Sequence, residues 1–409
     1  MRRLFAYVIA VQAALIGFGG SVRIAAAQVS DDVVKIGVLN DQAGSVGDIG
    51  GKGSVVMAQL AIEDFGGQVL GKPVKLIFAD HQNKADIASA IARRWVDVEQ
   101  VDAIVDGASS SAALTINEVT RNARRVFMSS GAATTELTGA SCSPTTVQFN
   151  YDTFMLANGT VKAMLNQGYD TWYLLTADYA FGYSLEADVS RLVRANGGKM
   201  LGSVRHPLNA SDFSSFLLQA QASNAKAIGL ADAGTDTINA VKQAAEFGVS
   251  GRQRLAGLLV EITDVHALGL AAAQGMLVTT SFYWDLNEET RALTRRFAAA
   301  MGGDRVPTAV QAGVYAAVRH YLRAVQVAGT DDALKVVQQM KALPIDDPYN
   351  KGVQVREDGR VMHDVYLMQV KSPSESRYPF DYYKVVQKMR GEDVFRPLAE
   401  GGCPLVKKP

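Results

Sequence analysis

The sequence predicts an α/β fold made of two doubly wound lobes, each built on a parallel sheet. The first observation is length, because 409 residues suit two or three domains at roughly 100–200 residues per domain. The second is composition: 48% hydrophobic and 20% charged residues favour a packed core over disorder. The third is the order of elements, since short apolar strands alternate with amphipathic helices and this alternation starts twice.

The first run of elements begins near residue 34. Val34, Ile36 and Val38 point to one side of a strand, and a loop over 40–53 that is rich in glycine and aspartate follows. Apolar residues spaced as on a helix face then lead to Gly66, which ends the helix. Further strands are predicted over 73–79, 102–106 and 125–129, with helices that begin at Asp86 and Ser110 between them. This order is typical of a parallel sheet covered on both faces.

The second run starts near residue 151 and has the same character. Strands are predicted over 171–176, 200–204, 225–231, 255–259 and 275–279. Helices are predicted over 181–195, from about 213 to 220 with Ser211 as the N-terminal cap, and from about 238 to Gly248. After Trp284 the pattern changes to helices over 287–301, 308–327 and 332–341, followed by a strand over 361–370.

The N-terminal segment has the features of a secretory signal. Arg2 and Arg3 precede an apolar stretch, and Ala25 and Ala27 have the spacing that signal peptidase requires, so cleavage is expected after Ala27. A membrane anchor is the alternative. No uncharged apolar run after residue 27 reaches about 18 residues, and we therefore expect 1–27 to be removed from a soluble, exported protein.

Export and a low cysteine count together predict one disulfide. The sequence has two cysteines, and an exported protein meets an oxidising compartment, so Cys142 and Cys403 are expected to be bonded. Two free thiols are the alternative. The 41 basic residues equal the 41 acidic ones, which gives no basic face for a nucleic acid.

Signals for catalysis are weak. Gly51 and Gly53 are followed by Val56 where a dinucleotide-binding motif needs glycine. The sequence has no Gly-x-Ser-x-Gly elbow and no Walker loop. Its five histidines are scattered, with no pair four residues apart that would suit a metal. We therefore expect neither an enzyme nor a bound metal or cofactor.

Two small, hydroxyl-rich loops give a stronger signal for binding. Residues 106–111 read Asp-Gly-Ala-Ser-Ser-Ser, and residues 129–135 read Ser-Ser-Gly-Ala-Ala-Thr-Thr. Each follows a predicted strand, at the sheet edge where ligands of open α/β sheets bind. The first loop also opens a helix, whose free N–H groups suit a ligand carboxylate. Ordinary capping of that helix by serine is the alternative.

Several motifs, in this order along the chain, carry a resemblance to a known family. They are Val-Lys-Ile-Gly-Val-Leu (34–39), Asp-His-Gln-Asn (80–83), Ser-Ser-Ser (109–111), Gly-Ala-Ala-Thr-Thr-Glu-Leu-Thr (131–138), Asp-Tyr-Ala-Phe-Gly (178–182) and Gly-Met-Leu-Val-Thr (275–279). The mature chain resembles the solute-binding proteins of ABC transporters, in the branched-chain amino-acid (Leu/Ile/Val-binding) class. The resemblance implies a type I periplasmic binding fold, whose two lobes close over a ligand.

The resemblance also implies how the chain is divided. Lobe 1 is expected to hold 31–149 plus 284–350, and lobe 2 to hold 150–283 plus 360–400. The lobes are joined by a hinge with three crossings, expected near Asn150, near Tyr283 and between roughly 345 and 365.

Ten residues are expected at the ligand site on the strength of this resemblance. Ser109, beside Ser110, matches the serine that meets the ligand carboxylate, and Phe181 matches an aromatic residue that covers the ligand. The others lie in loops that face the cleft or supply a second aromatic or an acid for a ligand ammonium: Ala132, Ala133, Thr134, Tyr151, Tyr179, Asp232 and Glu261. The alternatives are a core position for Phe181, a helix cap for Asp232 and a solvated charge for Glu261.

Two departures from the family pattern bear on the ligand. Ala133 stands where amino-acid binders carry threonine, and Ala233 where they often carry tyrosine. Small residues at both places predict a larger cavity, which favours a bulkier carboxylate such as an aromatic acid over a branched-chain amino acid.

The expected function is that of a non-catalytic receptor. We expect a monomer in the periplasm that binds a small organic carboxylate, either an aromatic acid or a branched-chain or aromatic amino acid. It would deliver this ligand to an ABC permease in the inner membrane. A ligand-sensing subunit of a signalling system with the same fold is the alternative, and a secreted enzyme is a third class.

Overall fold

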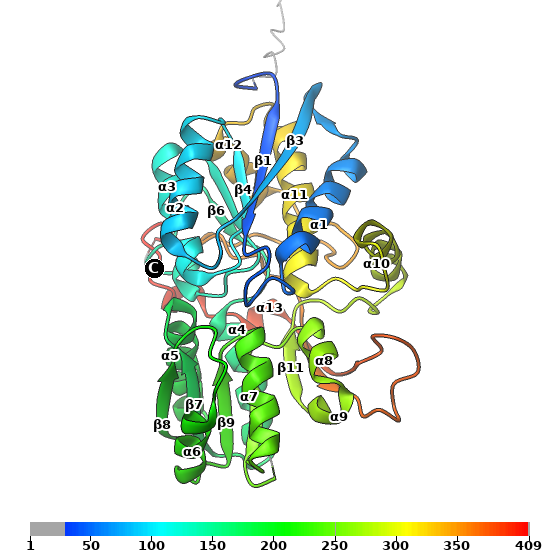
Figure 1. The fold of residues 1–409 in the computed structure, drawn as a ribbon. Coiled ribbons are helices and arrows are strands. Elements are labelled where there is room, and N and C mark those ends of the chain that lie inside the picture. The colour runs from blue at the N-terminus through cyan, green and yellow to red at the C-terminus, as the bar shows by residue number, and fades with distance from the viewer. Residues whose placement is uncertain (1–28, 250, 408–409) are drawn as a thin grey trace, which may run out of the picture.

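The computed structural model describes residues 29–249 and 251–407, so the expected signal segment 1–27 lies outside the described residues. The chain forms two α/β lobes, one above the other, with the sheets at the centre of each (Figure 1). In the described part of the chain, no helix is both long enough and apolar enough to cross a membrane.

The first lobe is built on a six-stranded sheet with the order β2-β3-β1-β4-β5-β6. Its strands are β1 (Val34–Asn40), β2 (Gln68–Val69), β3 (Lys72–Asp80), β4 (Ala103–Asp106), β5 (Val126–Ser129) and β6 (Thr146–Gln148). All neighbouring pairs are parallel except β2 with β3. A parallel sheet places the carboxyl ends of its strands at one edge, and this edge faces the second lobe (Figure 1).

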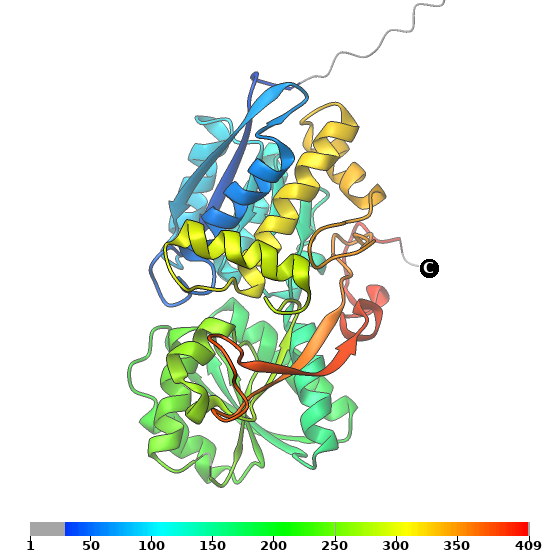
Figure 2. The same cartoon turned by 90° about the vertical axis from the view of Figure 1, so that its right-hand side faces the viewer.

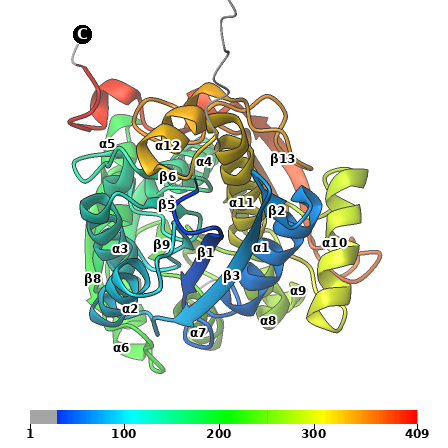
Figure 3. The ribbon, with the colours of Figure 1, turned by 90° about the horizontal axis from the view of Figure 1, so that it is seen from above.

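Helices cover both faces of this sheet. They are α1 (Gly51–Phe65), α2 (Ala85–Asp97), α3 (Ser110–Ala123), α10 (Glu288–Met301), α11 (Ala309–Ala328) and α12 (Ala333–Ala342), with a short 3-10 turn at Thr135–Thr138. From above, α1 and α11 lie on one side of the sheet and α2 and α3 on the other (Figure 3). Most of α11 is buried, because the helix packs between α1, α12 and the sheet.

The second lobe contains a four-stranded parallel sheet with the order β10-β9-β7-β8. Its strands are β7 (Thr171–Ala177), β8 (Lys199–His206), β9 (Ala227–Ala231) and β10 (Arg254–Gly257). Its helices are α4 (Thr153–Asn166), α5 (Ala180–Ala195), α6 (Ser214–Ala222), α7 (Thr235–Glu246), α8 (Ile262–Leu268) and α9 (Leu270–Ala273). The α/β fold with parallel sheets is therefore confirmed.

The second lobe differs from the prediction in several details, among them the helices α4, α8 and α9, which were not predicted. A three-stranded antiparallel sheet joins β11 (Leu277–Thr280), β12 (Val365–Val370) and β13 (Tyr383–Met389), so this lobe is not purely parallel; β12 and β13 are the orange and red strands in Figure 2. Ser211 does not cap α6: the helix starts after Phe213, and it is Asp212 that accepts a hydrogen bond from the Ser214 N–H at 2.8 Å.

The connections between the lobes meet at Asn150. Its carbonyl oxygen accepts hydrogen bonds from the Arg360 guanidinium and, at 2.7 Å, from His363 Nε2. Its side-chain amide oxygen accepts one from Ser281 Oγ. These four residues come from three separate stretches of chain, and all four are buried. Arg360 is fully buried, and its guanidinium also lies over the Phe395 ring, 4.6 Å from the centroid.

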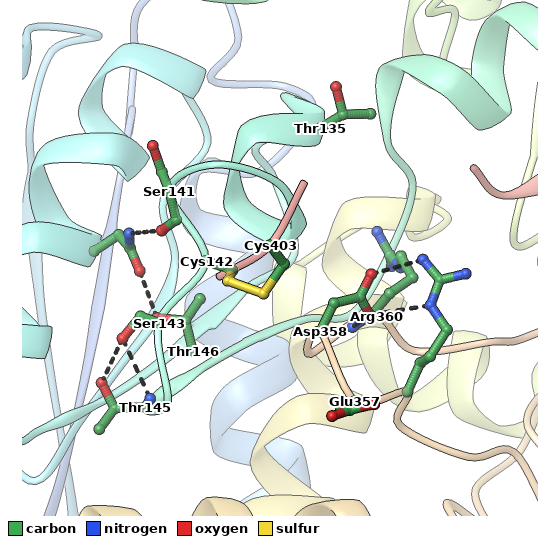
Figure 4. Close-up of a disulfide and its surroundings, with 12 residues drawn as sticks. Thr135, Ser141, Cys142, Ser143, Thr145, Thr146, Glu357, Asp358, Arg360 and Cys403 are labelled. Carbon is green, nitrogen blue, oxygen red and sulfur yellow. Dashed lines mark hydrogen bonds and ion pairs between the residues drawn. A yellow bond between two sulfur atoms is a disulfide. The ribbon is translucent and has the colours of Figure 1, made fainter. Parts of the chain in front are cut away.

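The C-terminal tail returns from the second lobe to the first. The short helix α13 (Gly391–Val394) is held by the Asn158 side chain of α4, which donates to the Val394 carbonyl at 3.0 Å. Beyond it, Arg396 donates to the Thr135 carbonyl of the first lobe at 2.9 Å. Cys403 is then bonded to Cys142, with Cα atoms 5.6 Å apart (Figure 4). The predicted disulfide is therefore present.

Candidate ligand-binding site

A small cavity lies between the lobes, where the carboxyl ends of β4 and β5 face those of the second lobe's sheet. Its lining residues come from both lobes: Val46, Ile49, Ala108, Ser109, Ser110, Gly131, Ala133, Tyr151, Tyr179, Phe181, Ala233 and Leu259. None of these described residues carries a charge. The cavity volume is only about 20 Å³, room for about one water molecule, so the side chains themselves fill most of the space.

A sharp turn at the end of β4 shapes the first-lobe wall. Asp106 and Gly107 have φ values of 86° and 67°, the left-handed region in which a non-glycine residue such as Asp106 is uncommon. The turn lets α3 begin only a few residues after the strand, with Ser109 as its N-cap residue. The N–H groups of the first helical turn, which have no partner within the helix, therefore begin at the cavity.

Ser109 and Ser110 have different roles in this wall. Ser109 is 3% exposed, its hydroxyl makes no cap hydrogen bond, and Oγ has no partner among the described residues. Ordinary helix capping therefore does not account for the Ser109 hydroxyl. Ser110 Oγ, by contrast, accepts a hydrogen bond from the Thr134 N–H at 3.2 Å, which ties α3 to the next loop.

That next loop, which follows β5, turns only some of its predicted residues toward the cavity. Ala133 lines the cavity, whereas Ala132 packs away from it in the cluster that contains Trp95 and Phe127. Thr134 does not line the cavity either; its Oγ1 accepts a hydrogen bond from the Glu136 N–H at 3.3 Å and caps the 3-10 turn.

Three aromatic side chains provide most of the opposite surface. The rings of Tyr179 and Phe181, at the start of α5, lie 5.9 Å apart between centroids with a tilt of 48°. Tyr151, just after β6, is 2% exposed, and its hydroxyl donates to the Gly131 carbonyl at 3.3 Å. Burial raises the pKa of both tyrosines, so both hydroxyls stay protonated near neutral pH.

The two predicted acids lie behind the cavity wall rather than in it. Asp232 is fully buried; its Oδ1 accepts a hydrogen bond from Thr237 Oγ1 at 2.5 Å, and its Oδ2 lies 3.4 Å from His206 Nε2. Glu261 precedes α8, and its Oε2 accepts a hydrogen bond from the Ala309 N–H at 3.1 Å. Glu261 therefore links α8 of the second lobe to the N-terminus of α11 in the first.

Buried acids surround the cavity; near neutral pH Asp106 is mostly ionised, whereas Glu261 is mostly protonated. Burial raises the pKa of Glu261 to about 8 and that of Asp106 to about 6. After burial itself, the charges of Glu261 and Asp106 are the next causes that raise the pKa of Tyr151. For Tyr179, the corresponding charges are those of Asp236 and Asp232. The cavity is thus neutral at its surface and surrounded by acids one layer out.

The structure brings six of the ten predicted residues to the cavity wall. These are Ser109, Ser110, Ala133, Tyr151, Tyr179 and Phe181, while Ala132, Thr134, Asp232 and Glu261 lie beside it. The sequence analysis missed Val46 and Ile49, the apolar residues of the loop after β1, although apolar side chains in a glycine-rich loop were a usable signal. Ala133 and Ala233 both line the cavity; the larger ligand space that they were expected to provide stays a prediction.

The chain matches a known protein family and resembles several solved structures. Residues 33–376 match the family model described as "Periplasmic binding protein". A periplasmic binding protein from Burkholderia mallei is 49% identical, with a TM-score of 0.90 over 92% of this chain and 100% of its own. A branched chain amino acid ABC transporter periplasmic ligand-binding protein from Burkholderia xenovorans is 41% identical, with a TM-score of 0.81 over 91% of this chain and 99% of its own.

A third solved structure shows the same fold at lower identity. A solute-binding protein of an ABC transporter from R. palustris, in complex with benzoate, is 18% identical, with a TM-score of 0.79 over 91% of this chain and 100% of its own. The family match covers most of the chain, and the type I periplasmic binding fold is shared throughout. The chain therefore belongs to the periplasmic binding protein family, as a solute-binding protein of an ABC transporter.

Proposed function

We propose that this protein binds a small carboxylate with an apolar or aromatic body between its lobes and delivers it to an ABC permease in the inner membrane. The observation that carries the proposal is the Ser109 hydroxyl, which is buried, faces the cavity at the N-terminus of α3 and has no hydrogen-bond partner among the described residues. A buried hydroxyl without a partner is costly, and a ligand carboxylate would satisfy it together with the free N–H groups of the helix.

The rest of the cavity wall suits an apolar ligand body. Tyr151, Tyr179 and Phe181 supply aromatic surface, and Val46, Ile49 and Leu259 supply aliphatic surface. An aromatic ring packs well against such a wall, because offset and edge-to-face ring pairs add about 0.5–1.5 kcal/mol beyond the burial of area.

The shell of acids bears on the choice between the two ligand classes. An aromatic acid carries only a negative charge, which the acids behind the wall oppose. An amino acid adds an ammonium group, which the same acids attract. An ionised Asp106 therefore favours an apolar or aromatic amino acid, whereas the aromatic wall accepts both classes. The experiment below includes both.

Entry of a ligand requires the lobes to separate. A cavity of about 20 Å³ excludes any organic acid, and its wall is shared between the lobes. We propose that lobe 1 (31–149 plus 284–350) and lobe 2 (150–283 plus 360–400) move apart about the connections at Asn150 and close again on the ligand. The functional form in this proposal is a periplasmic monomer from which residues 1–27 have been removed.

A thermal-shift screen with matched ligand pairs tests the proposal. Benzoate, L-phenylalanine and L-leucine are compared with benzamide and L-phenylalaninamide, which keep the body but lack the carboxylate. A true ligand at about 100 times its dissociation constant adds about 2.7 kcal/mol to the free energy of unfolding, and small-angle scattering should then show a smaller radius of gyration. Equal stabilisation by the acid and the amide of a pair would contradict the role given to the carboxylate.

A further inference from the structure

Asp106 is a buried carboxyl group that neither the resemblance nor the site residues explain. It ends β4, directly before the turn that leads to Ser109, and it is fully buried. Asn40 Nδ2 donates to Oδ2 at 2.8 Å, but Oδ1 has no hydrogen-bond partner among the described residues. The Ser54 and Ser130 hydroxyls lie near enough to lower the pKa of Asp106, but neither makes a hydrogen bond of ordinary geometry to Oδ1. A buried carboxylate oxygen without such a bond is costly.

The unpartnered oxygen lies directly behind the cavity wall. A Cβ atom added to Gly131 would stand 2.4 Å from Asp106 Oδ1 and 2.6 Å from the Cα atom of Ala108. Gly131 and Ala108 both line the cavity. The backbone of Gly131 is therefore the layer that separates the Asp106 carboxyl group from the ligand space, and only glycine fits there.

Among the described residues, Asp106 has no ion pair, and no cation contributes to its pKa shift. Its neighbours are Asn40 at the end of β1, Ser54 in α1 and Ser130 after β5, and none of them is titratable. Burial raises the pKa of Asp106, and these three polar groups lower it only in part, to about 6. The charge of Asp106 raises the pKa of Tyr151, as do the charges of Glu261 and Asp264 on the α8 side.

We propose that Asp106 is a specificity-determining residue that takes up a proton from solvent when a carboxylate ligand binds beside Ser109. Two carboxylates with one glycine backbone between them cannot both stay ionised at low cost. If the two charges lie about 6 Å apart at an effective dielectric constant of about 20, the ligand charge raises the pKa of Asp106 by about two units. The protonated group can then donate to an oxygen nearby instead of repelling the ligand. This inference rests on the proposed function, because it requires a carboxylate in the cavity.

The proposal predicts the direction in which ligand affinity changes with pH. The ligand binds the protonated form more tightly, so affinity falls as the pH rises above about 6. The loss is about tenfold per pH unit, up to about 100-fold in total, because two units of pKa correspond to two decades of affinity. Near pH 7.5, binding should take up about 0.5–1 proton per ligand.

Calorimetry of the full chain in two buffers with different ionisation heats counts these protons, with benzoate and L-phenylalanine as probes. Asp106→Asn keeps the shape of the side chain and cannot ionise, so proton uptake should fall to near zero and affinity at pH 8 should rise at least tenfold. Asp106→Ser serves the same comparison if the asparagine variant does not fold. Asp102→Asn is the matched control, because Asp102 precedes the same strand, is also buried and has a pKa raised to about 7 by burial, but lies at the opposite end of β4.

Each outcome decides one of the two proposals. Proton uptake in the native chain and in Asp102→Asn, but not in Asp106→Asn, supports the role of Asp106. Binding without uptake, or uptake that persists in Asp106→Asn and therefore belongs to Glu261 or Asp264, overturns that role and leaves the proposed function standing. If neither probe binds the native chain, the proposed ligand class fails, and the inference about Asp106 fails with it.

Discussion

Replacing Ser109 by alanine removes one hydroxyl group from the cavity wall and little else. Ser109 Oγ has no hydrogen-bond partner among the described residues, so the substitution breaks no contact within the protein. Alanine removes a buried polar atom without a partner, and stability should stay equal or rise slightly. The ligand complex, in contrast, loses a hydrogen bond to a charged group, which is worth about 1.5–3 kcal/mol. Affinity should therefore fall by roughly ten- to a hundredfold.

Titration calorimetry and thermal unfolding, measured on the same samples, separate these two effects. The matched control is Ser111→Ala, two residues along in the same serine run, because Ser111 does not line the cavity. Ser110→Ala provides a structural contrast: it removes the acceptor of the Thr134 N–H and should lower stability by about 1 kcal/mol. Unchanged affinity in Ser109→Ala, for a ligand that closes the lobes, would refute the placement of the carboxylate at the start of α3.

Three further outcomes follow from contacts described above. Reduction of the disulfide, whose cysteines are 261 positions apart, should lower the free energy of unfolding by about 2–5 kcal/mol. This loss is smaller than the roughly 5–6 kcal/mol of the chain-entropy model. Denaturant titration with and without reductant measures the difference, and coincident curves would contradict the stabilising role of the disulfide. Gly131→Ala should lower both stability and ligand affinity, because its Cβ would collide with Asp106, whereas Gly303→Ala, with nothing within 4 Å, should change neither. Burial raises the pKa of Glu261 to about 8, above its value in the unfolded chain. Folding therefore binds a proton, and the free energy of unfolding falls as the pH rises from about 5 to 8. Glu261→Gln should flatten this decline in denaturant titrations, and an unchanged slope would contradict the assignment.

The sequence was sufficient for strands with a clear apolar run or alternation, and insufficient for the short strand β6 and for β13. The alternation around Val34 and Ile36 marked β1, which is buried along most of its length. The edge strand β13 escaped notice because five of its seven residues, from Lys384 to Lys388, are exposed, and such a strand has no apolar pattern. Its position is fixed by hydrogen bonds to β12. Such pairing between distant segments cannot be predicted from the composition of β13.

The same distinction applies to the site. Loops at the ends of two neighbouring parallel strands must lie close together, so Ser109 and Ala133 could be placed near one another from the order of elements. Which residues of a loop face inward depends on its backbone turns, and adjacent Ala132 and Ala133 point to different clusters. The volume of the cavity also depends on aromatic side chains of the second lobe, which a local count of small residues does not include.

The bond between Cys142 and Cys403 has a topological consequence. It closes a covalent ring that contains every element from β6 to α13, and therefore the entire second lobe. A single protease cut in any loop of that ring leaves the two fragments joined, so they migrate apart on a gel only after reduction. The sequence holds no third cysteine, and oxidation within one chain therefore has a single possible product. Pairing errors, which limit the yield of many disulfide-bonded proteins, can arise here only between two chains.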